Sequence, residues 1–169
     1  MIIDGIHIAQ TPEQMELLDE FIEEYNVVTF IELGVYKGGL SNVMIKRQSE
    51  NFKYYGFEFD LTAIESCMRS APEITVADVN LKHIIEMIEQ LISASNGVAY
   101  VLCDTFNKPR EMTTYAKLLR VGDLLEGHDF PGEVSAEFLD KFGEENPDFD
   151  EIRPDEFREL GFTLWRKVK

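Results

Sequence analysis

The chain has 169 residues, and a content of 44% hydrophobic and 11% aromatic residues is enough for one packed domain and excludes a disordered chain. It carries 32 acidic residues against 16 lysines and arginines, so its formal net charge is −16. A protein this acidic repels phosphate backbones and anionic lipids, which disfavours nucleic acid and membranes as its main partner.

The cysteines and the N-terminal sequence bear on the cellular compartment. Cys67 and Cys103 lie in apolar segments without metal-ligand spacing, which favours two buried, reduced thiols. The first residues show neither the basic region nor the long apolar region of a signal peptide, and Val98–Cys103, the most apolar run near the centre, is too short to span a bilayer. We therefore expect a cytoplasmic protein.

Short apolar runs alternate with amphipathic segments along the chain. Met15, Leu18 and Ile22 have helical spacing, and Thr11 can cap the helix that they predict. The predicted strands are Val27–Leu33, Tyr54–Phe59, Ile74–Ala77, Val98–Cys103, Asp123–Gly127 and Phe162–Val168. The helices predicted between them are Leu40–Arg47, Thr62–Arg69, Leu81–Ile92 with Asn80 as its N-cap, Pro109–Leu119 and a short helix from Pro154 to Gly161.

This alternation of strands and helices predicts an α/β fold, a Rossmann-like three-layer sandwich with a mainly parallel sheet of six to seven strands and an antiparallel last strand. The chain reads as a single domain over residues 1–169. It has an N-terminal helix within 1–26, a core over 27–130 and an abbreviated C-terminal part over 131–169. In that last part only one clear strand is expected, and Glu133–Glu151 reads as a looser acidic stretch.

A glycine-rich segment follows the first strand, where ligands bind in such sheets. It reads Glu32-Leu-Gly34-Val-Tyr-Lys-Gly38-Gly39, and it matches neither a P-loop nor GxGxxG, because Lys37 precedes the glycine pair and position 36 is not glycine. An acid before the turn would repel a pyrophosphate and suits a cationic amino-acid head group. The alternative is an ordinary glycine turn.

Single acids end the next two strands. Glu58 stands where an acid can accept both hydroxyls of a ribose, although it could also be a surface acid. We interpret Asp60, two residues on, as a helix N-cap. Asp78 follows the third strand and could bind an adenine amino group, but aspartates are common in loops.

Asp104, His128 and Asp129 follow the fourth and fifth strands. Because the ends of neighbouring parallel strands lie about 5 Å apart, these side chains can converge on one hard cation or one reacting hydroxyl. A purely structural role for His128 is an equal alternative. We expect no functional role for His7 or His83.

Together these strand ends resemble the class I S-adenosylmethionine-dependent methyltransferases over roughly residues 27–130. ELGVYKGG is similar to their first motif, GFEFD to the end of their second strand and ADV to the end of their third. Asp104 and the His128-Asp129 pair resemble the branch of cephalosporin-hydroxylase-type and macrocin-type O-methyltransferases. In that branch an acid after strand four and an acidic pair after strand five hold a divalent metal, and here His128 stands in place of the first acid of the pair.

The resemblance implies a role for each of these residues. The methionine part of S-adenosylmethionine would lie alongside Glu32, Gly34, Gly38 and Gly39. Glu58 would bind its ribose and Asp78 its adenine. Asp104 would lie where donor and acceptor meet. Asp104 and His128 would be the catalytic residues. His128 would act either as the general base or, with Asp104 and Asp129, as a ligand of Mg²⁺ or Mn²⁺.

The implied activity is O-methylation of a small polyhydroxyl or sugar-like acceptor. The chain is short for this family and offers no insertion large enough to form a substrate lid. Two alternatives follow: a second copy in a homo-oligomer presents the acceptor, or the site is open. The alternative is a non-catalytic module or scaffold that binds S-adenosylmethionine.

Overall fold

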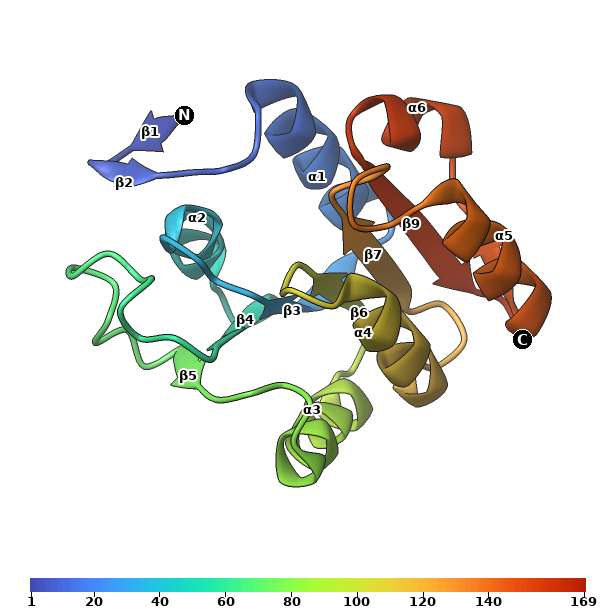
Figure 1. Ribbon diagram of the computed structural model, residues 1–169. Coiled ribbons are helices and arrows are strands. Elements are labelled where there is room, and N and C mark those ends of the chain that lie inside the picture. Colours follow the sequence, from blue (N-terminus) through green and yellow to red (C-terminus); the bar gives the residue numbers. More distant parts are fainter.

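In the computed structural model of residues 1–169, seven strands form one sheet. The sheet is twisted and runs through the middle of the molecule (Figure 1). The strands are β3 (Val27–Leu33), β4 (Lys53–Glu58), β5 (Ile74–Val76), β6 (Val98–Cys103), β7 (Leu124–His128), β8 (Phe149–Glu151) and β9 (Phe162–Lys167). Their spatial order is β5-β4-β3-β6-β7-β9-β8; β3 to β7 run parallel, and β9 is antiparallel to both of its neighbours. The predicted α/β fold and its antiparallel last strand are confirmed.

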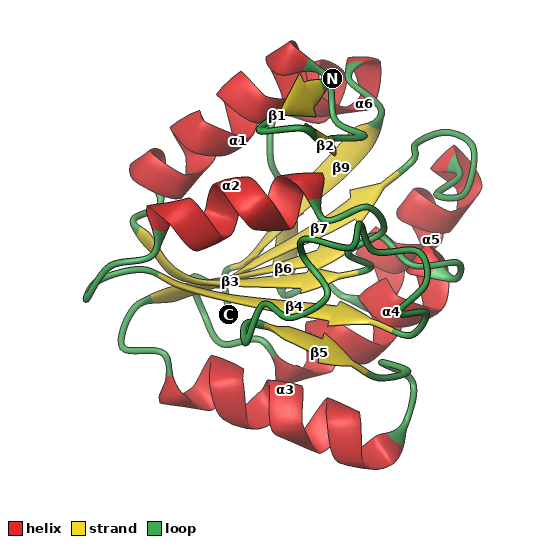
Figure 2. Cartoon of the chain, turned by 90° about the vertical axis from the view of Figure 1, so that its left-hand side faces the viewer, coloured by secondary structure: helices red, strands yellow, loops and turns green.

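Helices cover both faces of the sheet (Figure 2). One layer holds α1 (Pro12–Glu24), α2 (Gly39–Arg47) and α6 (Pro154–Glu159), and the other holds α3 (Lys82–Ala94), α4 (Lys108–Tyr115, extended by the 3-10 turn Ala116–Leu118) and α5 (Ala136–Glu145). Each layer has its own hydrophobic core against the sheet, of 18 and 20 buried residues respectively. Burial on both faces explains why β6 reads as a continuous apolar run.

The order of the strands reverses between β3 and β6. The chain leaves β3 toward β4 on one side, and it returns through β6 to continue toward β7 on the other side. Leu33 pairs with Phe57 on one side and with Cys103 on the other, and Cys103 pairs with Gly127. The residues after these strands therefore meet at one edge, at the switch point where such sheets bind ligands.

The predicted helix over Thr62–Arg69 is wrong, because residues 61–70 form a series of turns. The Asp60 carboxylate accepts hydrogen bonds from the Thr62 backbone N–H at 2.8 Å and from the Thr62 hydroxyl at 2.6 Å. Such local bonds compete with the helical pattern, so Asp60 holds a turn instead of capping a helix. Asn80 is not an N-cap either: α3 begins after Leu81.

The C-terminal part is more complete than the sequence predicts. The acidic stretch contains α5, which Ser135 caps, and β8 pairs with β9 at the edge of the sheet, so the expectation of a single strand there is wrong. A strand of three residues with two acids carries too weak a pattern to be recognised.

Other features of the chain differ from expectation or extend it. A small hairpin, β1 (Ile2–Ile3) with β2 (Ile6–His7), precedes α1 and was not predicted. Cys103 is buried as expected, but Cys67 is exposed.

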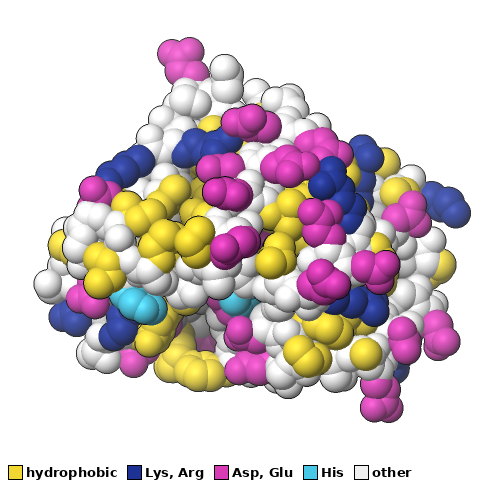
Figure 3. All heavy atoms as spheres, turned by 90° about the horizontal axis from the view of Figure 1, so that it is seen from above, with side chains coloured by type: hydrophobic (Ala, Val, Ile, Leu, Met, Phe, Trp, Pro, Cys, Tyr) yellow, Lys and Arg dark blue, Asp and Glu magenta, His cyan; other side chains and the backbone are white.

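Figure 3 shows acidic side chains spread over one face of the molecule, in keeping with the net charge. No helix has both the length and the apolar character that a bilayer crossing requires.

Candidate active site

Two adjoining cavities lie at the carboxyl edge of the sheet. The larger has a volume of about 350 Å³ and the smaller about 210 Å³, and Phe59, Thr105 and Phe106 line both of them. Of the residues proposed from the sequence, Gly34, Glu58, Asp104, His128 and Asp129 line the larger cavity and Asp78 lines the smaller one. Residues from five different strand ends thus line two cavities that share part of their wall.

Only one of the three proposed glycines faces this space. Gly34 has a φ of +98°, and a Cβ atom there would lie 2.7 Å from the carbonyl carbon of Asp104, so the turn after β3 requires glycine. Gly38 caps α2 with a φ of +86°. Gly39 packs against the N-terminal segment, where a Cβ would lie 2.6 Å from the Ile8 Cα. Gly38 and Gly39 line neither cavity and shape the turn instead.

Glu32 also lies outside both cavities. Its carboxyl group is buried beneath the turn and accepts hydrogen bonds from the Ser41 hydroxyl at 2.8 Å and from the Tyr54 hydroxyl. Burial raises the pKa of Glu32 to about 8, so the carboxyl is protonated near neutral pH. It carries no charge there with which to attract a cationic head group.

Glu58 joins the glycine turn to the end of β4. Its carboxylate accepts the backbone N–H of Tyr36 at 2.9 Å and that of Asp60 at 3.0 Å. A carboxylate offers about four acceptor positions, so each oxygen can still accept a hydroxyl from the cavity. Tyr36, also at the cavity wall, has a φ of +51°, which is uncommon outside glycine.

Asp78 lines the smaller cavity. It accepts the backbone N–H of Asn80 at 2.9 Å and the side-chain amide of Asn80 at 3.1 Å, and these bonds lower its pKa. The rings of Phe59 and Phe106, which line both cavities, meet edge to face at 5.8 Å. Phe106 is 84% exposed. These two aromatic rings were not predicted as part of the site.

Asp104, His128 and Asp129 converge as the sequence predicts. One ligand atom from each of the three lies within 4.8 Å of the others. His128 Nδ1 is 3.2 Å from Asp129 Oδ1 and 3.5 Å from Asp104 Oδ1, but no hydrogen bond of favourable geometry reaches either ring nitrogen. Asp129 has a φ of +62°, a second uncommon backbone conformation at the cavity wall.

These neighbours set the protonation of the cluster. Burial raises the pKa of Asp104 to about 6, although His128 and Lys108 act against it. Burial alone would lower the pKa of His128, but the carboxylates of Asp129, Asp104 and Glu126 outweigh it and raise that pKa to about 9. His128 and Lys108 hold the pKa of Asp129 well below its ordinary value. At neutral pH His128 is therefore a cation.

The sequence reasoning missed Lys108, which lies inside this cluster. Its ammonium nitrogen lies 2.9 Å from Asp129 Oδ2, 3.3 Å from Asp104 Oδ1 and 2.7 Å from Glu133 Oε2, and it also donates to the Thr105 carbonyl at 3.0 Å. The signal that could have revealed it is its spacing, because it follows Asp104 by four residues where α4 begins.

The Asp104, His128 and Asp129 set does not fit a resident Mg²⁺ or Mn²⁺ while Lys108 holds this position. The three donor groups are close enough together, but a divalent ion takes hard oxygen ligands at about 2.0–2.2 Å. Two of the oxygens concerned already face a buried ammonium group, and the imidazole is protonated.

No protein-family model matches the sequence, and no curated protein matches it. Solved structures do share its fold. A structure of CmcI with Mg and S-adenosylmethionine has a TM-score of 0.73 at 17% identity, over 100% of this chain and 77% of that chain.

Two O-methyltransferases agree with this result. TomG from Streptomyces achromogenes, involved in tomaymycin synthesis and solved with S-adenosylmethionine, has a TM-score of 0.57 at 16% identity, over 99% of this chain and 84% of its own. An O-methyltransferase from Bacillus cereus, solved with S-adenosylhomocysteine, has a TM-score of 0.59 at 14% identity, over 94% and 82%. The chain therefore has the Rossmann-like fold found in S-adenosylmethionine-dependent O-methyltransferases.

Proposed function

We propose that the protein is an S-adenosylmethionine-dependent O-methyltransferase that acts on a small polyhydroxyl or sugar-like acceptor. The observation that carries this proposal is the placement of three acids along the two adjoining cavities: Asp78 lines the smaller, Glu58 and Asp104 line the larger, and Phe59, next to Glu58 in the chain, lines both. This placement suits adenine, ribose and a sulfonium centre in turn. Bound S-adenosylmethionine and S-adenosylhomocysteine in structures of the same fold support it.

The residues of the smaller cavity and the junction would hold the donor. Asp78 is ionised and can accept from an exocyclic amine, and Glu58 can accept from ribose hydroxyls with its remaining lone pairs. Gly34 lines the larger cavity, so its backbone would lie beside the bound donor. S-adenosylmethionine supplies the electrophilic methyl group when it is bound.

The acceptor would occupy the rest of the larger cavity. Its wall there is polar and charged, with Asp104, Lys108, His128, Asp129 and Glu133, and such a wall binds hydroxyl groups better than apolar surface. Methylation of a hydroxyl forms an O–C bond and releases the hydroxyl proton, so a base must lie nearby. With its pKa near 6, Asp104 is mostly ionised at neutral pH and can take that proton, whereas His128 already carries one.

The same cluster gives the second candidate, a protein that binds S-adenosylmethionine without transferring its methyl group. Every carboxylate that faces the cavity beside His128 is already paired with Lys108 or with the imidazole. If those ion pairs do not open to an acceptor, no base is free and the protein serves as a sensor or scaffold.

Turnover separates the two candidates. Methyl transfer from isotopically labelled S-adenosylmethionine should be measured against a panel of sugars, glycosides and polyols, with an Asp104→Asn variant as the matched control. Transfer that disappears in the variant supports the methyltransferase. Binding of the donor with no transfer to any member of the panel favours the non-catalytic module.

A further inference from the structure

Lys108 is a buried cation at the centre of the cluster. Only 4% of its side chain is exposed, yet four oxygen atoms surround its ammonium group: one each from Asp104, Asp129 and Glu133, and the carbonyl oxygen of Thr105. The partners come from the end of β6, the end of β7 and the loop after it. The ammonium group therefore ties together the same segments that a shared metal ion would join.

The position of Lys108 in the fold makes an incidental contact a poor explanation. A lysine is almost never fully buried unless its charge is paired. Lys108 is also the first residue of α4, and the positive end of a helix dipole disfavours a cation there. Three carboxylates compensate for both costs. Although burial alone would lower the pKa of Lys108, these carboxylates raise it above its ordinary value.

We infer that the Lys108 ammonium group takes the place of a divalent cation between Asp104 and Asp129, so that this centre orients its carboxylates without a metal. An ion that bound Asp129 Oδ2 and Asp104 Oδ1 would share the space with a nitrogen that lies 2.9 Å and 3.3 Å from those atoms. Repulsion between like charges is strong in a water-poor site. The inference rests on the proposed function only in treating this cluster as the reacting centre.

Lys108 acts as a positioning residue in this account. It fixes the Asp104 carboxylate on the wall of the larger cavity and holds Asp129 and Glu133 beside it. The acceptor hydroxyl would then meet a carboxylate of fixed direction, and the charge balance of the centre would not depend on the metal content of its surroundings.

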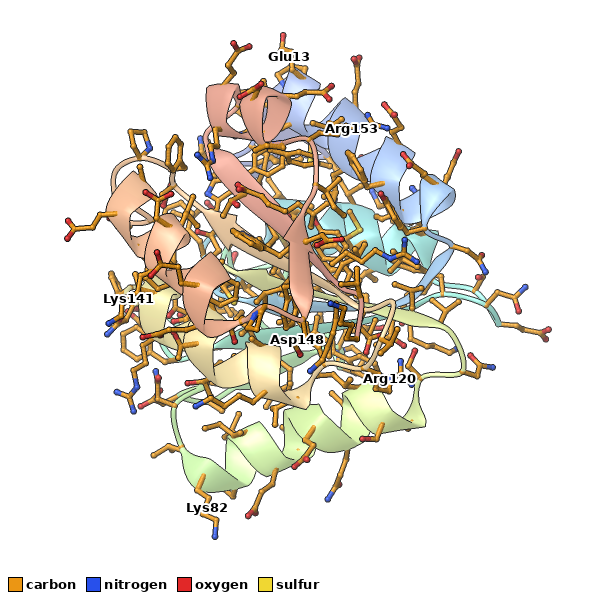
Figure 4. All side chains as sticks on the ribbon, turned by 90° about the vertical axis from the view of Figure 1, so that its right-hand side faces the viewer. Glu13, Lys82, Arg120, Lys141, Asp148 and Arg153 are labelled. Carbon is orange, nitrogen blue, oxygen red and sulfur yellow. The ribbon has the colours of Figure 1, made fainter.

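Mn²⁺ binding tests the inference without any need for turnover. Free Mn²⁺ is followed by electron paramagnetic resonance in titrations of the wild-type protein, of Lys108→Met and of Lys141→Met. Lys141 is the matched control, because it lies on α5 with 69% of its side chain exposed (Figure 4). We expect Lys108→Met to bind one Mn²⁺ ion at this centre at least about tenfold more tightly than the wild type and Lys141→Met do.

A double variant, Lys108→Met with Asp129→Asn, should lose the ion that Lys108→Met gains. Thermal unfolding gives a second measurement: Mn²⁺ should raise the midpoint of Lys108→Met and leave that of the wild type unchanged. If Lys108→Met does not fold, Lys108→Gln takes its place.

Two results would overturn the inference. One is a wild-type protein that binds Mn²⁺ at this centre and loses it in Asp129→Asn. The other is a folded Lys108 variant that binds Mn²⁺ no better than the wild type. S-adenosylhomocysteine binding, measured in parallel, reports on the proposed function separately: its failure would remove the methyltransferase and leave the Mn²⁺ result to decide the role of Lys108.

Discussion

The backbone of Gly34 passes so close to Asp104 that a Cβ atom at residue 34 would lie 2.7 Å from the Asp104 carbonyl carbon. This approach joins the end of β3 to the end of β6 and forms one wall of the larger cavity. Two parts of the candidate site, the glycine turn after β3 and Asp104, therefore pack directly against each other.

Replacement of Gly34 by alanine should damage both stability and donor binding. The residue has a φ of +98°, which strains any side chain, and the backbone of Asp104 cannot easily move away. We expect Gly34→Ala to lower the free energy of unfolding by about 2–4 kcal/mol, as measured by urea denaturation. Gly122 has a φ of +97° with open space around it, so Gly122→Ala shows the cost of backbone strain alone. Equal losses in the two variants would contradict close packing at Gly34.

Glu32 should make stability depend on pH. The pKa of Glu32 is about 8 in the folded protein, against an ordinary value of 4.5. Between these two pH values the folded state keeps a proton that the unfolded state has released. The contribution of the protonated Glu32 carboxyl to the free energy of unfolding is therefore fully present below pH 4.5, and it is lost as the pH rises through about 8.

A variant isolates this effect from that of other buried acids. Glu32→Gln carries no charge at any pH, so relative to the wild type it should gain stability between about pH 4.5 and about pH 8, by up to about 1.4 kcal/mol per pH unit. Urea denaturation of both proteins across that range measures the difference. A constant difference across the range would show that Glu32 is ionised in the folded protein.

Asp104 and His128 predict different pH profiles for methyl transfer. If Asp104 takes the acceptor proton, kcat/KM should rise with pH through about 6, the pKa to which burial raises Asp104, and Asp104→Asn should lose a factor of about 100 or more. S-adenosylhomocysteine affinity should change little in that variant, because the base acts on the acceptor. A rise through about pH 9 that disappears in His128→Gln would assign the base to His128 instead.

The sequence predicts the order of strand ends because each apolar run stops at a residue of distinct chemistry. Glu58, Asp78, Asp104 and the His128-Asp129 pair all line the cavities, as expected from the rule for parallel sheets. Glu32 does not, because it lies one residue before the end of β3 and its side chain points into the layer of α2 and toward Tyr54. Strand position without side-chain direction could not distinguish these two cases.

The role of Lys108 and the turns after β4 could not be predicted from the sequence. The role of Lys108 depends on Asp129 and Glu133, which return to it from more than twenty residues further along the chain. Residues 61–70 have a capping residue and helical spacing, yet the bonds of Asp60 to Thr62 and of Arg69 to the Ile64 carbonyl fix turns instead. In both cases contacts of the folded chain decide the outcome.

Isothermal titration calorimetry with S-adenosylhomocysteine measures donor binding itself. The variant is Glu58→Ala, and its control is Glu89→Ala, which removes an exposed acid on α3. We expect one binding site per chain in the wild type and in Glu89→Ala. In Glu58→Ala the binding free energy should weaken by about 1–3 kcal/mol, since ribose hydroxyls lose their acceptor. Wild-type protein that binds NAD but not S-adenosylhomocysteine, or Glu58→Ala that binds as tightly as the wild type, would contradict the proposed donor site.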